Sequence, residues 1–173
     1  MRVLLASAAA LMVLAVSHAA GQTARVSSWP SLGFAAEFPG KPELESTPAE
    51  GEGTFSSQMV SSSSKDGYFA VSVATIEEFT AEAIADSATR ERIFDGAQSN
   101  SIEQGGTTLK SQRSLMLDGR YGREFISAMP DGSAMVHTRA YLEPSRLYIQ
   151  IAVITNRKAP KTGTRFLNSF KFL

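Results

Sequence analysis

Hydrophobic and polar residues alternate through residues 107–155, and short turn signals cut this stretch into four pieces of strand length. The turn signals are Asp118-Gly119, Pro130-Asp131-Gly132 and Pro144-Ser145. Asp-Gly tolerates the positive φ angles of a tight hairpin turn, and proline presets φ for the first corner of a turn. In the last piece one face carries Leu147, Ile149, Ile151 and Val153, and the other carries Tyr148, Gln150, Ala152 and Ile154. The pattern predicts a four-stranded antiparallel meander.

The residues before the meander predict further strands. Residues 34–38 alternate as a short strand, and Pro39-Gly40 ends an edge strand there. Two longer runs, residues 54–64 and 68–76, flank the hairpin signal Lys65-Asp66-Gly67. The remaining segments are expected to be a poorly ordered lead-in at residues 22–30 and an exposed loop at residues 41–53.

Two helices are expected, one before the meander and one after it. Ile93, Phe94 and Ala97 lie at helical spacing within residues 88–104, and Gly105-Gly106 ends this helix. The candidate N-cap residues are Thr80 and Ser87. The second helix spans residues 160–170, where the apolar positions are Phe166, Leu167 and Phe170.

If each turn of the meander is a two-residue loop, every cross-strand partner is fixed. One face, which we expect the helix at residues 88–104 to cover, is a core face. It carries Met116, Tyr121, Phe125, Met129, Val136, Thr138, Ala140, Leu142, Leu147, Ile149, Ile151 and Val153. The opposite face is apolar enough to need partial cover. It carries Leu109, Leu115, Ile126, Met135, Tyr141, Tyr148 and Ile154.

The same registers place one polar residue from each strand in a row on this opposite face. The row is Arg113, Glu124, Arg139 and Gln150. Opposite charges directly across strands contribute about 0.2–1 kcal/mol each. One interpretation is a solvated stripe. The other is a polar patch, rimmed by Tyr141, Tyr148 and Met135, that suits a protein partner or an anionic ligand. The candidate interaction patch consists of Arg113, Glu124, Arg139, Gln150, Tyr141 and Tyr148.

Residues 1–20 have the pattern of an export signal. Met1-Arg2 is basic, residues 3–16 are apolar except for Ser7, and residues 17–21 are mostly small. The apolar run is shorter than the roughly 20 residues that span a bilayer. We expect cleavage after Ala19 or Ala20, with an uncleaved anchor as the alternative. The mature protein is then one soluble domain at residues 21–173, periplasmic or secreted, without stable membrane insertion.

The composition excludes several classes of function. The chain has no cysteine, which rules out thiol nucleophiles, zinc–thiolate sites, iron–sulfur clusters and lipid attachment to cysteine. The 17 basic side chains equal the 17 acidic ones, so charge gives no case for a nucleic-acid partner. No cofactor is expected.

Catalytic patterns are likewise missing from the sequence. His137, which the registers place between Ile126 and Ala152, has no ligand-like spacing to other histidines or carboxylates and is expected to be structural. The serines occur without a G-x-S-x-G elbow, and Glu77-Glu78 would point to opposite sides of a strand. Gly105-Gly106 follows a helix rather than opening one, so it is no phosphate loop. The sequence therefore predicts a protein that is not an enzyme.

Several motifs together resemble a group of exported bacterial proteins with an F-P-G-K-P opening and an R-F-x-x-S-F-K closing motif. The matching segments are Gly33-Phe34, Phe38-Pro39-Gly40-Lys41-Pro42, residues 119–124, Arg146-Leu147-Tyr148 and residues 165–171. More remotely, the chain resembles the PsbP-like fold group, which includes photosystem extrinsic subunits, DcrB periplasmic proteins and some mycobacterial lipoproteins. The resemblance implies an α+β fold, a three-layer α/β/α sandwich around an antiparallel sheet, with the order hairpin, helix, four-strand meander, helix.

The resemblance implies binding or assembly roles rather than catalysis, and it supplies no active site. We therefore expect a non-enzymatic exported accessory or protein-binding domain whose partner is an envelope protein. The alternative is a periplasmic small-molecule carrier with a pocket between the sheet and a helix.

Overall fold

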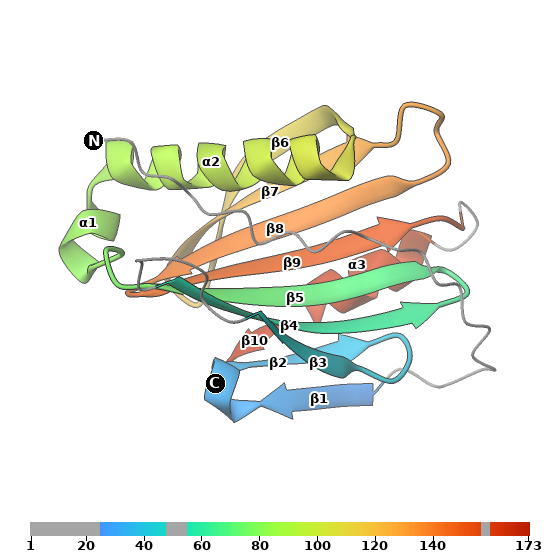
Figure 1. The fold of residues 1–173 in the computed structure, drawn as a ribbon, viewed down its shortest axis with the longest axis horizontal. Coiled ribbons are helices and arrows are strands. Elements are labelled where there is room, and N and C mark those ends of the chain that lie inside the picture. Colours follow the sequence, from blue (N-terminus) through green and yellow to red (C-terminus); the bar gives the residue numbers. More distant parts are fainter. Residues whose placement is uncertain (1–24, 48–54, 157–159) are drawn as a thin grey trace.

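The computed structural model describes residues 25–47, 55–156 and 160–173 (Figure 1). The predicted export signal at residues 1–20 lies outside these residues. Within the described ranges, no helix is both long enough and apolar enough to cross a membrane. The strands are β1 (Arg25–Trp29), β2 (Phe34–Phe38), β3 (Glu43–Thr47), β4 (Phe55–Ser64), β5 (Gly67–Ile76), β6 (Thr108–Leu117), β7 (Arg120–Ala128), β8 (Met135–Glu143), β9 (Arg146–Ile154) and β10 (Lys171–Phe172). The helices are α1 (Ala81–Ala85), α2 (Ser87–Gly105) and α3 (Pro160–Asn168), with a 3-10 turn at Pro30–Leu32.

The main element is a seven-stranded antiparallel sheet in the order β3-β4-β5-β9-β8-β7-β6. The predicted meander is confirmed as β6 to β9, and the predicted hairpin is confirmed as β4 and β5. Strands β3 and β6 form the two edges of this sheet (Figure 1).

The meander turns set the strand registers as predicted. Asp118 and Gly119 have φ angles of 51° and 77°, so both central residues of the β6–β7 turn are left-handed and Leu117 lies opposite Arg120. Ser145 is also left-handed, with a φ of 62°, in the β8–β9 turn. The β6–β7 ladder departs from the predicted register only beyond Ser111, where it shifts between Leu109 and Ser111.

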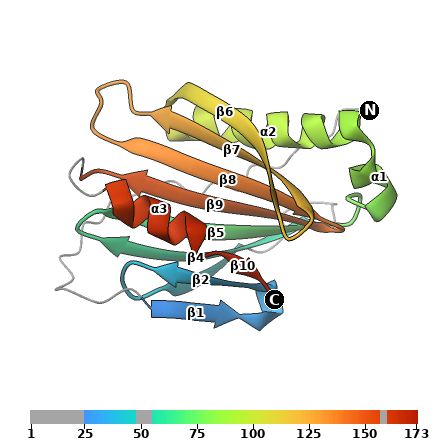
Figure 2. The ribbon, with the colours of Figure 1, turned by 180° about the vertical axis from the view of Figure 1, so that it is seen from behind.

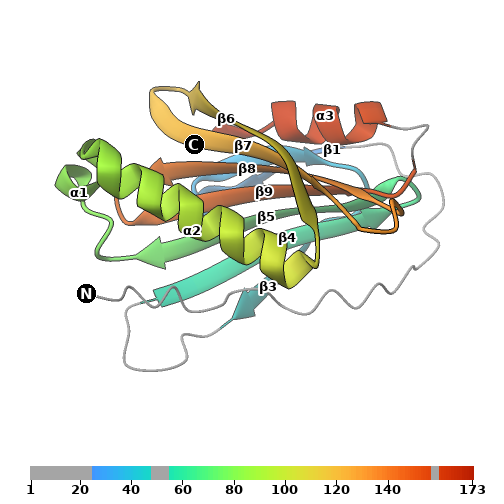
Figure 3. The ribbon, with the colours of Figure 1, turned by 90° about the horizontal axis from the view of Figure 1, so that it is seen from above.

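The sheet is covered on both faces. Helix α2 crosses one face, while α3 and the small sheet β1-β2-β10 lie on the other (Figures 1 and 2). Viewed from above, α2 and α3 are on opposite sides of the strands (Figure 3). The α+β fold with a large antiparallel sheet is confirmed, and the third layer combines a helix with a small sheet.

The small sheet corrects two expectations about the chain near residue 30. Residues 25–29 form β1, which pairs with β2, where a poorly ordered lead-in was predicted. Strand β2 is central rather than an edge, because β10 pairs with its other side through Lys171–Ala35 and Phe172–Phe34. Pairing between segments so far apart leaves no local sequence signal. The helix predicted at residues 160–170 is confirmed as α3, which ends at Asn168, and the short strand β10 that follows it was not predicted.

Two further local predictions were wrong. Glu43–Thr47, expected within a loop, forms the edge strand β3 by pairing with β4. An edge strand tolerates charged residues such as Glu43 and Glu45, so the composition of this segment resembled that of a loop. Thr80 caps α1 as predicted, but α2 is capped by Asp86 rather than Ser87: the Asp86 carboxylate accepts the Thr89 N–H at 2.7 Å.

The two faces of the sheet carry separate hydrophobic cores. Under α2 the buried residues are Ala74, Ile76, Phe79, Ile93, Phe94, Ala97, Ala140, Leu142 and Leu147. The face expected to be only partly covered holds the larger core, which includes Phe34, Phe38, Val60, Phe69, Val71, Tyr141, Tyr148, Phe166, Leu167 and Phe170. Conversely, Met116 and Tyr121 were predicted to lie in the α2-side core, but they are 61% and 44% exposed.

Candidate functional site

The predicted polar row exists. Cross-strand pairing joins Arg113 to Glu124, Glu124 to Arg139, and Arg139 to Gln150. The Glu124 carboxylate accepts the Nε–H of Arg113 at 2.8 Å on one oxygen and that of Arg139 at 2.6 Å on the other. Burial alone would raise the pKa of Glu124, but the hydrogen bonds and charges of Arg139 and then Arg113 outweigh it and lower this pKa. Glu124 is therefore a carboxylate held between two guanidinium groups.

One end of the row is tied to α3. Arg139 Nη1 donates to the Leu167 carbonyl at 3.1 Å and to Asn168 Oδ1 at 2.9 Å. Gln150 Nε2 lies 3.5 Å from the same carbonyl. Carbonyl groups in the last turn of a helix lack intrahelical partners, and a cation there also interacts favourably with the helix dipole. This half of the row therefore fastens α3 to the sheet.

For half of the patch residues, burial excludes both a solvated stripe and an open interaction surface. Tyr148 and Gln150 are 0% exposed and Tyr141 is 2% exposed, so they do not border an open surface. They are buried because α3 and the residues around β10 cover this end of the row, which the registers alone could not show. Phe172, for example, packs edge-on against the Tyr141 and Tyr148 rings. Arg113 remains at the open end, with 68% of its side chain exposed.

A second Arg–Glu cluster lies on the same face and was not singled out from the sequence. Glu143 accepts Arg120 Nε at 2.6 Å on one oxygen and the Tyr148 hydroxyl at 3.0 Å on the other. Arg146 Nη1 donates to the same hydroxyl at 3.2 Å, and the Arg120 guanidinium lies 4.0 Å from the Phe172 ring centroid. The predicted registers already align Arg120, Glu143 and Arg146, so a second reading of them would have found this cluster.

A third cluster is formed around Arg123, which is buried on the α2 side. Arg123 forms ion pairs with Asp95, at 2.5 Å, and with Glu91, both on α2. The guanidinium also lies 5.5 Å from the Phe94 ring centroid. The sequence signal was a charged residue between two apolar positions of a core-facing strand, together with two carboxylates four residues apart on the covering helix. This cluster holds α2 onto β7.

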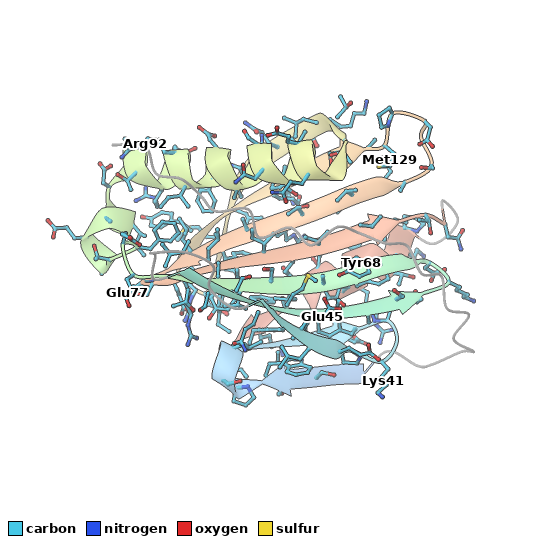
Figure 4. The ribbon with its side chains drawn as sticks, in the orientation of Figure 1. Lys41, Glu45, Tyr68, Glu77, Arg92 and Met129 are labelled. Carbon is cyan, nitrogen blue, oxygen red and sulfur yellow. The ribbon has the colours of Figure 1, made fainter. Side chains whose placement is uncertain are left out.

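Two further titratable side chains, His137 and Tyr68, have pKa values that burial shifts. His137 lies between Ile126 and Ala152 as predicted, and burial lowers its pKa, with the Arg139 charge acting in the same direction and Glu124 opposing it. Burial likewise raises the pKa of Tyr68, which Figure 4 shows on β5 with Glu45 on the nearby β3. No group of three or more potential metal ligands occurs within residues 25–47, 55–156 and 160–173.

The opening and closing sequence motifs meet in the structure. Ser169 Oγ accepts the Glu37 N–H at 2.7 Å, and Arg165 forms an ion pair with the Glu37 carboxylate. The aromatic rings of the two motifs pack together, with centroids 5.6 Å apart for Phe34–Phe170 and 5.2 Å apart for Phe38–Phe166. Both motifs thus join α3 to β2.

Two large hydrophobic side chains and an arginine are exposed on the β6–β7 hairpin. Met116 and Tyr121 are cross-strand neighbours on the α2 side, and Arg90 of α2 stacks on the Tyr121 ring at 3.8 Å. On the other side of the hairpin is Arg113. We call Arg113, Met116 and Tyr121 the β6–β7 surface.

No family model and no curated protein matches the chain. Among solved structures, the cyanobacterial PsbP protein (CyanoP) of Synechocystis sp. PCC 6803 aligns over 92% of this chain and 99% of its own, with a TM-score of 0.55 at 11% sequence identity. PA94, a Pseudomonas aeruginosa protein of unknown function, aligns over 85% of this chain and 93% of its own, with a TM-score of 0.43 at 10% identity. The likeness to CyanoP supports the predicted PsbP-like fold.

Proposed function

We propose that the protein is a non-enzymatic, exported accessory domain that acts by binding a protein partner of the cell envelope. The observation that carries this proposal is the contrast between the polar clusters and the β6–β7 surface. The arginines and carboxylates of the clusters and Tyr148 form hydrogen bonds or ion pairs with one another, whereas Met116 and Tyr121 are 61% and 44% exposed. Arg113 pairs with Glu124 but is still 68% exposed. An exposed aromatic residue, methionine and arginine are the residue types enriched at protein interfaces.

The carrier alternative needs room between a helix layer and the sheet. On the α3 side this space is filled by aromatic rings whose centroids lie 5.0–5.9 Å apart. This packing favours the protein-binding proposal and gives no support to a ligand pocket in that layer. A ligand that copurifies with the protein in native mass spectrometry would favour the carrier.

The test is site-specific photo-cross-linking in a native envelope extract. A photoreactive residue at position 116 should give a discrete adduct with one envelope protein. The matched control is the same residue at exposed Lys65, in the β4–β5 turn, which should give none. Equal labelling from both positions, or no adduct from position 116, would contradict the proposal.

A further inference from the structure

The outer side of β6 is an available strand edge. Among the described strands β6 pairs with β7 alone, and its residues from Thr108 to Ser114 are all exposed, on both faces. Most β-sheet edges are shortened or covered, because unpaired backbone groups can bind another strand. The regular part of this edge runs from Ser111 to Leu117, beyond the bulge near Lys110.

Hairpin geometry identifies the backbone groups that point outward. In a two-residue turn with positive φ at both centres, the flanking residues Leu117 and Arg120 form a hydrogen-bonded pair. Hydrogen-bonded and non-hydrogen-bonded pairs alternate along an antiparallel ladder. The N–H and C=O groups of Gln112, Ser114 and Met116 therefore point away from β7.

The charge beside this edge is positive on the α3 side. On the α2 side Arg123, which lies opposite Ser114, is neutralised by Glu91 and Asp95. Strand β6 contains Lys110 and Arg113 and no acidic residue. The nearby Glu124 carboxylate is shared by Arg113 and Arg139, which leaves one positive charge in excess in that row. Asp118, at the tip of the hairpin, is the other carboxylate in the β6–β7 hairpin.

We infer that β6 binds an extended, acidic segment of the protein partner as an added strand of the sheet, an inference that rests on the proposed function. The partner's backbone pairs with Gln112, Ser114 and Met116, and a carboxylate lies beside Arg113 on the α3 side. An apolar side chain on its other face contacts Met116 and Tyr121. Main-chain hydrogen bonds supply affinity in this mode of recognition, and alternate side chains supply specificity.

A second copy of this chain fits the β6 edge less well. Twofold antiparallel pairing of two β6 strands would bring Lys110 and Arg113 of both copies into one short ladder, and like charges across strands destabilise such pairing. The acidic edge strand β3, with Glu43 and Glu45, is the segment of a second copy that could compete for β6. If β3 of a second copy bound to β6, the protein would self-associate.

The experiment uses isotope-labelled protein secreted from an exporting host and three ten-residue synthetic peptides. Each peptide alternates valine with glutamate, glutamine or lysine. The glutamate peptide should bind at least tenfold more tightly than the glutamine peptide, with the lysine peptide weakest. It should shift and protect the amides of Gln112, Ser114 and Met116, and its affinity should fall as salt rises.

Two pairs of variants test the mode of binding. Ser114→Pro removes an outward N–H without touching the β6–β7 ladder and should weaken binding tenfold or more, whereas Ser114→Ala should bind within about twofold of the parent, since the neutral exchange keeps that N–H. Arg113→Gln should abolish the preference for glutamate over glutamine, whereas Lys65→Gln, an equal charge change at the opposite turn, should preserve it. Thermal unfolding of each variant confirms that it is folded.

The inference is overturned if the three peptides bind equally or not at all, if the protected amides lie elsewhere, or if Ser114→Pro binds normally. Self-association of the protein with protection of the same amides would make a second copy the occupant and would also overturn it. An envelope adduct from position 116 that survives Ser114→Pro would leave the proposed function intact and remove only the added strand.

Discussion

At the scale of single residues, Glu124 is the charge on which the polar row depends. Its side chain is 13% exposed and accepts hydrogen bonds from two arginines. Glu124→Gln replaces one acceptor oxygen by an amide that faces a guanidinium. We expect it to lower the free energy of unfolding at pH 7 by about 1–2 kcal/mol, at or below the lower end of the range for hydrogen bonds to charged groups, because Arg113 is largely exposed. Urea denaturation measures the change, with exposed Glu77→Gln as the control.

The same residue predicts a pH dependence. The pKa of Glu124 is lowered in the folded protein, so its contribution is complete above the pKa of the unfolded chain and is lost as pH falls through the folded value. The stability difference between the parent and Glu124→Gln should therefore be present at pH 7 and shrink in acid, below about pH 4. Urea titrations at pH 7 and pH 3 test this; an equal difference at both would show that the mutation acts through packing.

Replacing Gln150, unlike replacing Glu124, should leave the stability of the protein unchanged or raise it. Gln150 is 0% exposed, its Oε1 has no hydrogen-bond partner in the described structure, and its Nε2 makes only a long contact with the Leu167 carbonyl. Gln150→Met removes the unpartnered acceptor and keeps the volume, while Arg139 still serves that carbonyl. We expect stability within about 1 kcal/mol of the parent, or higher. A loss above about 2 kcal/mol in denaturation would indicate a buried partner for Oε1.

At the scale of elements, α3 depends on its aromatic anchor. Phe166 is 0% exposed and packs against Phe38 and Phe69, with ring centroids 5.2 and 5.5 Å away. Phe166→Ala should lower the free energy of unfolding by about 3–5 kcal/mol, as expected for deletion of a buried aromatic ring. Exposed Thr164→Ala on the same helix is the control, and it should leave the denaturation midpoint nearly unchanged.

The N-cap residue of α2 differs between the sequence-based prediction, Ser87, and the structure, Asp86. Asp86 caps the helix, and its hydrogen bond to Thr89 lowers the pKa of the carboxyl. Asp86→Ala should therefore lower the melting temperature, and Ser87→Ala should not. The reverse result would restore Ser87 as the cap.

The elements that are specified by residues close together in the sequence were predictable. Turn residues with positive φ and the period of alternation gave the meander, its registers and the polar row, all of which depend on neighbours in sequence. Strands β1, β3 and β10 were not predictable, because each is a strand only by virtue of its pairing. The extent to which α3 and the small sheet cover the opposite face was not predictable either, and this cover is what buries Tyr141, Tyr148 and Gln150.

At the scale of the whole molecule, the small sheet links residues from both ends of the described chain. Lys171 and Phe172 pair with β2, and the Leu173 N–H donates to the Gly33 carbonyl at 3.0 Å. Deleting residues 171–173 should lower the free energy of unfolding by about 2 kcal/mol or more through the Phe172 ring. It should also speed hydrogen exchange in β1 and β2 more than in β4 and β5. Leu173→Ser, which keeps the backbone at an exposed position, should do neither.

This linkage has a consequence for how the protein is made. The Glu37 N–H donates to Ser169 Oγ, 132 positions later, and β10 pairs with β2. Strand β2 therefore cannot complete its hydrogen bonds until these late segments have been made. During synthesis, which proceeds from the N-terminus, Phe34 and Phe38 therefore stay exposed until α3 and β10 have been made. Contacts of such long range form slowly and late. The rings of Phe34 and Phe38 therefore reach their buried positions only after α3 and β10 have been made, because Phe170 and Phe166 pack against them.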